Sequence, residues 1–362
     1  MNDRLISLDA FRGFTIAAMI TVNYPGSWSH VYAPLLHAEW NGITPTDLIF
    51  PFFLFIVGVS IALAYTKRVQ QKAPKPEIYK KVIIRSLKIF VVGLLLNFIH
   101  HFTLSELRIA GVLQRIAVVF LVCAILFLNT KWKTQAIVGG AILLVYCMVM
   151  TLIPTPGVGA VSLEPGVNIA AWVDSMFLPG KLWQKTWDPE GLLSTFPAIV
   201  TGITGMLAGT LILSDMEKNR KVVWLFALGF LATIAGQVWD WIFPINKNLW
   251  SSSYVLFTSG LASMTLAASI FFIDILGFRK GTKIGIIFGA NAITVYVLAA
   301  LFRFIFYGTK FGDLTLNNHF MEIFSPILGE PKLASLIYAL LYISFNFIPI
   351  YILYRKKIFI KL

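Results

Sequence analysis

The sequence carries very little charge for its length. Only 13% of its 362 residues are charged, while 57% are hydrophobic, and ordinary soluble domains carry about 25% charged residues. A water-soluble fold of this length would be unable to cover so much apolar surface. The shortage of charge therefore excludes an ordinary soluble protein and indicates a chain that is solvated by lipid.

The sequence also lacks the short motifs of several enzyme and pump classes. It contains no Walker A loop, no Gly-x-Ser-x-Gly, no His-Glu-x-x-His and no Cys-x-x-Cys, so ATP-driven pumping, serine-hydrolase chemistry and metal-dependent hydrolysis lack their usual residues. The two cysteines, Cys123 and Cys147, lie within apolar runs, where we expect free, buried thiols. We expect no bound metal.

What the sequence does contain is a series of continuous apolar runs of about 20 residues, which is the length of a membrane-spanning helix. Backbone polar groups in lipid must be paired within the chain, so only helices or closed barrels cross a bilayer, and the short alternating segments of a barrel are not seen. We therefore predict an all-α polytopic membrane protein with about ten transmembrane helices. The predicted helices occupy residues 10–28, 45–66, 82–99, 109–129, 134–153, 191–213, 221–242, 252–274, 284–306 and 333–354.

Most of the 30 basic residues fall in alternate loops between these helices. Lysine and arginine are enriched in cytoplasmic loops, so both termini are predicted to be cytoplasmic. The net charge of +13 is then a feature of topology, and we expect no nucleic-acid partner. The basic segments are residues 4–12, 67–88, 131–133, 218–221, 279–283 and 355–361. The loops on the opposite, extracytoplasmic side are residues 24–44, 100–108, 154–190, 243–251 and 307–332.

The longest outer loop, residues 154–190, contains Trp172, Trp183 and Trp187. Loops of this length usually have a function or their own structure. Its tryptophans either anchor the loop at the membrane interface or stack against a substrate.

The first outer loop and the helix after it hold a concentrated set of polar residues. The first helix ends near Asn23, the loop carries His37, and the next helix opens with Thr44, Pro45 and Asp47. Thr44 is suited to cap this helix, with Pro45 at the first position and Asp47 three residues after the cap. Asp47 is therefore either a capping residue alone or a carboxylate that orients or charges a neighbouring imidazole.

Other charged residues stand where membrane proteins rarely place them. Arg115 lies inside a predicted helix, where a guanidinium needs a carboxylate, a phosphate or an aqueous cavity, so structural pairing and ligand contact both stay open. Asp188 and Glu190 stand at the outer start of a helix, and capping accounts for one of them more readily than for both. Lys247 is a lone lysine in an outer turn, against the general charge distribution.

Seven segments of the sequence, taken in order, resemble one known family. Two of them are long enough to be specific, HAEWNGITPTDLIFP at 37–51 and NKNLWS at 246–251. The other five are residues 4–13, 23–24, 111–115, 188–191 and 352–359. These segments are distributed from residue 4 to residue 359, so the similarity extends over nearly the whole chain. On these segments the chain is similar to the heparan-alpha-glucosaminide N-acetyltransferase family.

The resemblance implies a function and a set of catalytic residues. The lysosomal members of the family acetylate the terminal glucosamine of heparan sulfate across a membrane with cytosolic acetyl-CoA. We therefore expect a single transmembrane acyltransferase domain over residues 1–362, which moves an acetyl group from acetyl-CoA to an extracytoplasmic amino sugar. His37 would act as general base or acyl carrier, Asn23 would donate to the thioester carbonyl, and Asp47 would fix the imidazole tautomer.

The resemblance also implies binding residues and a location. The amino sugar is expected to contact Trp40, Asn41, Asp188, Glu190, Lys247 and Asn248. Acetyl-CoA is expected to contact Arg4, Arg12, Arg85 and Arg115, because guanidinium groups suit nucleotide phosphates. Because the chain has ten predicted spans and no targeting sequence, we expect a multi-pass protein of the bacterial inner membrane. The sequence does not decide whether the protein is a monomer or a homodimer. The alternatives are an amino-sugar transporter without CoA chemistry and a structural subunit of an envelope complex.

Overall fold

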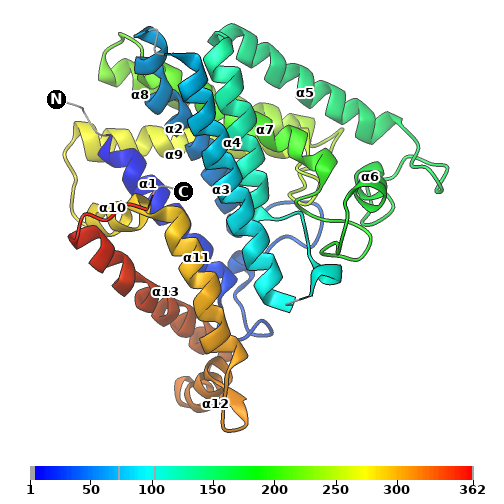
Figure 1. Ribbon diagram of the computed structural model, residues 1–362, viewed down its shortest axis with the longest axis vertical. Helices are drawn as coiled ribbons and strands as arrows, with labels where there is room; N and C mark the ends of the chain where they lie inside the picture. Colours follow the sequence, from blue (N-terminus) through cyan, green and yellow to red (C-terminus); the bar gives the residue numbers. More distant parts are fainter. Residues whose placement is uncertain (1–4, 72–73, 102, 361–362) are drawn as a thin grey trace. The chain divides into compact units, whose positions relative to one another are not determined.

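The structure is a computed structural model that describes residues 5–71, 74–101 and 103–360 (Figure 1). Within these residues it is predominantly helical, and its one sheet is a pair of two-residue strands. The predicted all-α class is therefore confirmed. The chain forms two compact units: unit 1 comprises residues 1–38, 44–53 and 269–362, and unit 2 comprises residues 39–43 and 54–268. Whether they act as one domain stays a prediction.

Unit 2 contains most of the long apolar helices. These are α2 (Ile49–Gln70, from residue 54 on), α3 (Lys75–His101), α4 (Val112–Asn129), α5 (Trp132–Leu152), the short α6 (Ile169–Phe177), α7 (Leu192–Ile212), α8 (Lys218–Trp239) and α9 (Ser252–Ser269), with a 3₁₀ turn η3 (Leu104–Glu106).

Helices α4 and α7 pack against each other in unit 2, with α3 on α4 and α5 on α7 (Figure 1). Small residues allow the closest contacts, since a Cβ at Gly58 of α2 would lie 2.0 Å from the carbonyl oxygen of Gly202 in α7. Such backbone-to-backbone approach is typical of membrane helices, which gain little from the hydrophobic effect between them. Cys123 and Cys147 are free and buried, as predicted.

Unit 1 combines both ends of the chain. Its elements are α1 (Ile6–Asn23), the 3₁₀ turns η1 (Ala33–Leu35) and η2 (Pro45–Leu48), the π-helix η4 (Ile270–Ile275), α10 (Thr282–Ala290), α11 (Ala292–Arg303), the π-helix η5 (Phe304–Gly308), β1 (Lys310–Phe311), β2 (Leu314–Thr315), α12 (Leu316–Leu328) and α13 (Pro331–Arg355). Helices α1 and α10 touch through glycine, since a Cβ at Gly13 would lie 1.7 Å from the carbonyl oxygen of Gly285.

The continuous helix that we predicted over residues 284–306 is broken. Helices α10 and α11 meet at Asn291 with a bend of 82°. The Asn291 side chain binds the backbone near the C-terminus: its Oδ1 accepts from the amide of Ile360 at 2.9 Å, and its Nδ2 donates to the carbonyl of Ile358 at 3.1 Å. These bonds to a segment distant in sequence hold a bend for which the local sequence gives little signal.

Eight helices among the described residues are long and apolar enough to cross a membrane, and the bent pair brings the number to nine. These helices coincide with nine of the ten predicted spans and confirm a polytopic membrane protein. The tenth coincides with α1, which has 18 residues but carries Asp9 and Arg12 and falls outside this set. The loops that we predicted to be extracytoplasmic contain elements that we did not predict, namely α6, α12 and the small hairpin.

Candidate active site

In unit 1 the structure joins His37 to Asp47. The Nδ1 atom of His37 lies 2.7 Å from Oδ1 of Asp47. The side chain of Asp47 is 1% exposed, whereas that of His37 is 48% exposed. An ionised carboxylate only accepts hydrogen bonds, so Nδ1 donates, and the second ring nitrogen, Nε2, is the one that can act as a base. The pair has the arrangement of a general base with its orienting carboxylate.

Local sequence places the carboxylate of Asp47. Thr44, Pro45 and Asp47 form the predicted capping box at the start of η2, which confirms the capping interpretation. The other carboxylate oxygen of Asp47 accepts from the amides of Ala38 and Thr44 and from the Thr44 hydroxyl, each at 3.0 Å. Capping and imidazole orientation are therefore performed by the same carboxylate through its two oxygens.

The loop before His37 is fixed to the same turn. The Thr46 hydroxyl donates to the carbonyl of Pro34 at 3.1 Å, and the Thr44 hydroxyl donates to the carbonyl of Leu36 at 2.6 Å. These bonds hold the backbone on the N-terminal side of the imidazole, so His37 is positioned by its backbone as well as by Asp47.

The other residues predicted in unit 1 are placed less specifically. Asn23 is the last residue of α1 and is exposed, and among the described residues its side chain makes no hydrogen bond to His37 or Asp47. Arg12 lies on α1 with its Nη1 3.4 Å from Oδ1 of Asp9. Arg4, which we predicted to contact CoA, lies outside the described residues.

In unit 2 the segment that follows His37 meets the turn before α9. The Nδ2 atom of Asn246 donates to Oδ1 of Asn41 at 3.1 Å, and the amide of Gly42 donates to the carbonyl of Ile245 at 2.8 Å. Lys247 and Asn248, which are half-buried, belong to the same turn. The structure therefore joins Asn41 and Gly42, which belong to one specific sequence block, to the turn that carries the other block, 246–251.

Trp40 extends this cluster to the long outer loop. Its ring meets that of Trp187 edge-on at 5.2 Å, and its Nε1 donates to the carbonyl of Leu163 at 3.0 Å. The Trp40 indole is half-buried, so part of its face is still available for contact with a ligand.

Asp188 and Glu190 are both engaged by one arginine that we did not assign to the site. The Nε of Arg108 donates to Oδ2 of Asp188 at 2.7 Å, and its Nη2 contacts both Asp188 and Glu190. The Arg108 guanidinium also lies 5.0 Å from the centre of the Trp183 ring. The sequence contained one signal for Arg108: it is a basic residue in a loop predicted to be extracytoplasmic, where the positive-inside rule expects few. Burial lowers the pKa of Arg108, but the two carboxylates outweigh this effect and the net pKa is raised.

Asp174 supports the same corner from α6. Its carboxylate accepts from the amide of Leu192 at 2.8 Å and from the amide of Asp188 at 3.4 Å. Burial raises the pKa of Asp174 to about 6, although these backbone amides act in the opposite direction. A Cβ at Gly191 would lie 2.0 Å from this carboxylate, so only glycine fits between α6 and the start of α7.

Arg115 is buried inside unit 2 and only partly satisfied. Its Nη2 donates to the carbonyl of Gly191 at 3.2 Å and to the Ser194 hydroxyl, and its guanidinium lies 5.0 Å from the centre of the Trp250 ring. Its Nε and Nη1 have no hydrogen-bond partner among the described residues. Trp250 itself adopts a left-handed backbone conformation (φ 51°), which is rare for a bulky residue and is found mainly at functional sites.

Arg85 lies apart from these outer residues on α3. It is 10 residues from the N-terminal end of α3, which corresponds to about 15 Å along the helix. Its guanidinium lies 4.9 Å from the centre of the Phe120 ring.

Comparison with known proteins supplies the family. A family model described as heparan-alpha-glucosaminide N-acetyltransferase, catalytic, matches residues 4–237. The human protein named heparan-alpha-glucosaminide N-acetyltransferase is 29% identical over 99% of this chain and 60% of its own length. The mouse protein of the same name is 27% identical over 99% of the chain and 61% of its own length. This chain thus spans about three fifths of the relatives that it matches. It belongs to the heparan-alpha-glucosaminide N-acetyltransferase family.

Proposed function

We propose that the protein is a transmembrane N-acetyltransferase that moves an acetyl group from acetyl-CoA to the amine of an extracytoplasmic amino sugar. The observation that carries this proposal is the pair of His37 and Asp47, in which a buried carboxylate holds Nδ1 of an imidazole whose side chain is half exposed. The membership in an acetyltransferase family supports the same reaction class.

In direct transfer, the amine attacks the thioester carbonyl and gives one proton to Nε2 of His37. The carbon–sulfur bond then breaks, the acetyl group stays on the amine nitrogen as an amide, and the thiolate of CoA takes the proton as it leaves. Asp47 stabilises the imidazolium through the bond to Nδ1. Asn23, at the end of α1, would donate to the oxygen of the tetrahedral intermediate.

A covalent route uses the same geometry. Nε2 attacks the thioester carbonyl, the carbon–sulfur bond breaks, and CoA leaves as a thiolate from an acetyl-imidazolium. The amine then attacks the acetyl group, the carbon–nitrogen bond to Nε2 breaks, and the proton lost by the amine goes to the CoA thiolate. Both routes use Nε2 of the same half-exposed imidazole. A burst of free CoA before any acceptor is added would identify the covalent one, and its absence would identify direct transfer.

The arginines are our candidates for the acyl donor. Arg115 offers two buried nitrogens, Nε and Nη1, that lack acceptors among the described residues, and oxygens of the donor would satisfy them. Arg4, Arg12 and Arg85 are proposed to contact the phosphates of CoA from the cytoplasmic half of the membrane, on the side where the basic loops predict both termini.

The amino sugar is proposed to contact Trp40 and Asn41, together with Lys247 and Asn248 of the neighbouring turn. Asp188 and Glu190, which we predicted to contact the sugar, instead bind Arg108 through their carboxylates. We propose that they act by positioning the long outer loop.

A transporter is the second candidate, and the bend at Asn291 is the observation in its favour. Secondary transporters bind substrates at broken helices whose free ends face the ligand. Here, however, the Asn291 side chain at the break binds the chain's own backbone at residues 358 and 360. A transporter predicts uptake of labelled amino sugar that is independent of acetyl-CoA.

The proposal is tested with the full chain in proteoliposomes, acetyl-CoA inside and a panel of amino sugars outside. Mass spectrometry should find an acetylated sugar in the outer solution, and His37→Ala should form it at least about 100-fold more slowly. CoA-independent uptake without acetylation would contradict the proposal, as would near-normal turnover by His37→Ala.

A further inference from the structure

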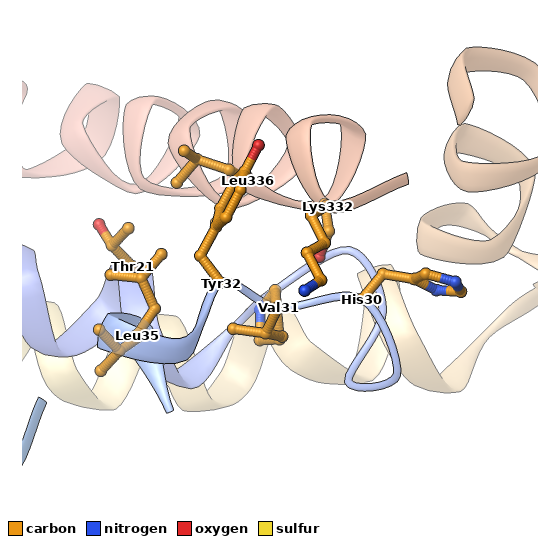
Figure 2. Close-up of a pocket in the computed structure, with 11 residues that line it drawn as sticks. Thr21, His30, Val31, Tyr32, Leu35, Lys332 and Leu336 are labelled. Carbon is orange, nitrogen blue, oxygen red and sulfur yellow. The ribbon is translucent and has the colours of Figure 1, made fainter. Parts of the chain in front are cut away.

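Unit 1 contains a hollow beside the loop that carries His37 (Figure 2). Its empty volume is about 250 Å³. Its walls come from the end of α1, the loop at residues 25–35 and the first two turns of α13. The loop wall ends at Leu35, two residues before His37.

The walls of this hollow are fixed by hydrogen bonds. The amide of Gly26 donates to the carbonyl of Ser335 at 3.2 Å, and the amide of Ser27 donates to the Ser335 hydroxyl at 3.1 Å. At the opposite end, the Tyr32 hydroxyl donates to a carboxylate oxygen of Glu330 at 2.8 Å. The loop is thus fastened to α13 at both ends, and the hollow is a preformed feature.

The lining combines apolar walls with one unpaired cation. Figure 2 shows the side chain of Lys332 reaching from α13 toward the loop between Val31 and His30, whose ring lies at the edge of the hollow. Lys332 makes no ion pair or hydrogen bond with any described residue. Glu330, the acidic group closest to it in sequence, is bound by Tyr32.

This lining narrows the class of ligand. The three hydroxyls on these walls already donate to protein acceptors: Thr21 to Ala17, Tyr32 to Glu330 and Ser335 to Ser27. A free sugar would therefore find few open hydrogen-bonding partners, and an inorganic anion would leave the apolar surface without a partner. A phosphate attached to an apolar chain satisfies both parts, with Lys332 on the phosphate and Val22, Val31 and Leu336 on the chain. Lys332 is the second residue of a membrane-spanning helix, which places it at the depth where phosphate headgroups lie.

We propose that this hollow binds the phosphate headgroup of a membrane amphiphile, and that the acceptor is an amino sugar carried on such a phosphate. The first part stands on the hollow and on Lys332. The second part rests on the proposed function, because it places the sugar beside the loop of His37.

Binding is tested first, without acetyl-CoA, by native mass spectrometry of the full chain in detergent. The probes are dioctanoyl phosphatidylglycerol, dioctanoylglycerol as the chains alone, and inorganic phosphate as the anion alone.

Phosphatidylglycerol should bind at least about tenfold more tightly than either part, and Lys332→Gln should remove this advantage. Lys332→Arg should retain it, as should Lys310→Gln, an exposed lysine of the same unit outside the hollow. Equal binding of phosphatidylglycerol by Lys332→Gln and the wild type would contradict the assignment of Lys332 to the site. Equal affinity of the wild type for inorganic phosphate and phosphatidylglycerol would contradict the assignment of an amphiphile as the ligand.

Transfer is tested second, with a phosphate-linked glucosamine lipid and with free glucosamine as acceptors. Lys332→Gln should raise KM for the lipid acceptor about tenfold and leave the reaction of free glucosamine unchanged. An equal effect on both acceptors would overturn the acceptor assignment. If the wild type acetylates neither, the proposed function fails, and the binding experiment alone decides the hollow.

Discussion

In unit 1 one buried carboxylate holds an imidazole, and in unit 2 two carboxylates hold a guanidinium. Asp47 holds Nδ1 of His37, whose side chain is still nearly half exposed. Asp188 and Glu190 share the Arg108 side chain, whose exposed fraction is 17%. The same elementary contact thus produces a reactive group in one region and a closed ion-pair cluster in the other. The difference lies in the cation, since an imidazole has a second nitrogen that can act as a base and a guanidinium stays protonated.

The largest expected effect comes from removing the charge behind the imidazole. Asp47→Asn should lower kcat for acetyl transfer by about 10²- to 10⁴-fold, because an amide does not stabilise the imidazolium and can hold the ring in the wrong tautomer. Initial rates in proteoliposomes measure this change. Asp188→Asn should leave kcat of the folded fraction close to that of the wild type, and a loss of kcat equal to that of Asp47→Asn would remove the distinction between the two regions.

Removing the cation of unit 2 should act on stability. Arg108→Gln leaves Asp188 and Glu190 buried without their counter-charge, which costs about 3–5 kcal/mol for a buried pair. The thermal midpoint in detergent should fall by several degrees. Lys181→Gln is the matched control, because the Lys181–Glu106 pair is half exposed and exposed pairs contribute about 0–1 kcal/mol. A thermal midpoint unchanged by Arg108→Gln would contradict a structural role for the cluster.

The contact at the helix break should contribute less. Asn291→Ala removes both bonds to residues 358 and 360 and should cost about 1–3 kcal/mol, since buried backbone groups lose their partner. Deletion of residues 358–362 should lower the thermal midpoint by a similar amount. Because both changes remove the same contact, the doubly changed protein should have nearly the same thermal midpoint as either single variant. A decrease equal to the sum of the two single decreases would show that the two changes act on different contacts.

The smallest effect is confined to acidic pH. The pKa of Asp174 is raised from 3.8 to about 6 by burial, so between these values the folded state binds more protons than the unfolded state. The contribution of Asp174 to stability is therefore complete below about pH 4, falls as pH rises toward 6, and is constant above it. Thermal midpoints of wild type and Asp174→Asn from pH 4 to 8 measure this. A parallel pH dependence in the two proteins would exclude Asp174 as the cause.

Sequence reasoning predicted the features that depend on local order. The apolar runs located the helices, and the spacing of Thr44, Pro45 and Asp47 predicted the cap. A contact of Asp47 with an imidazole was one of two alternatives that the sequence left open. The ion pairs of Arg108 join residues about 80 positions apart, and the break at Asn291 depends on a contact with the far end of the chain. Helices α6 and α12 lie in loops whose composition resembles that of interfacial segments. Contacts between residues distant in sequence depend on tertiary packing, which the local periodicity of hydrophobic residues does not predict.

The most direct test of the account is a double-mutant cycle on His37 and Asp47. Single-turnover acetyl transfer is compared for the wild type, His37→Gln, Asp47→Asn and the double variant, with His319→Gln as a control histidine in the same unit. Because Asp47 is proposed to act only through the imidazole, the double variant should be no slower than His37→Gln alone. Losses that multiply in the double variant would contradict the account, as would a near-normal rate for His37→Gln.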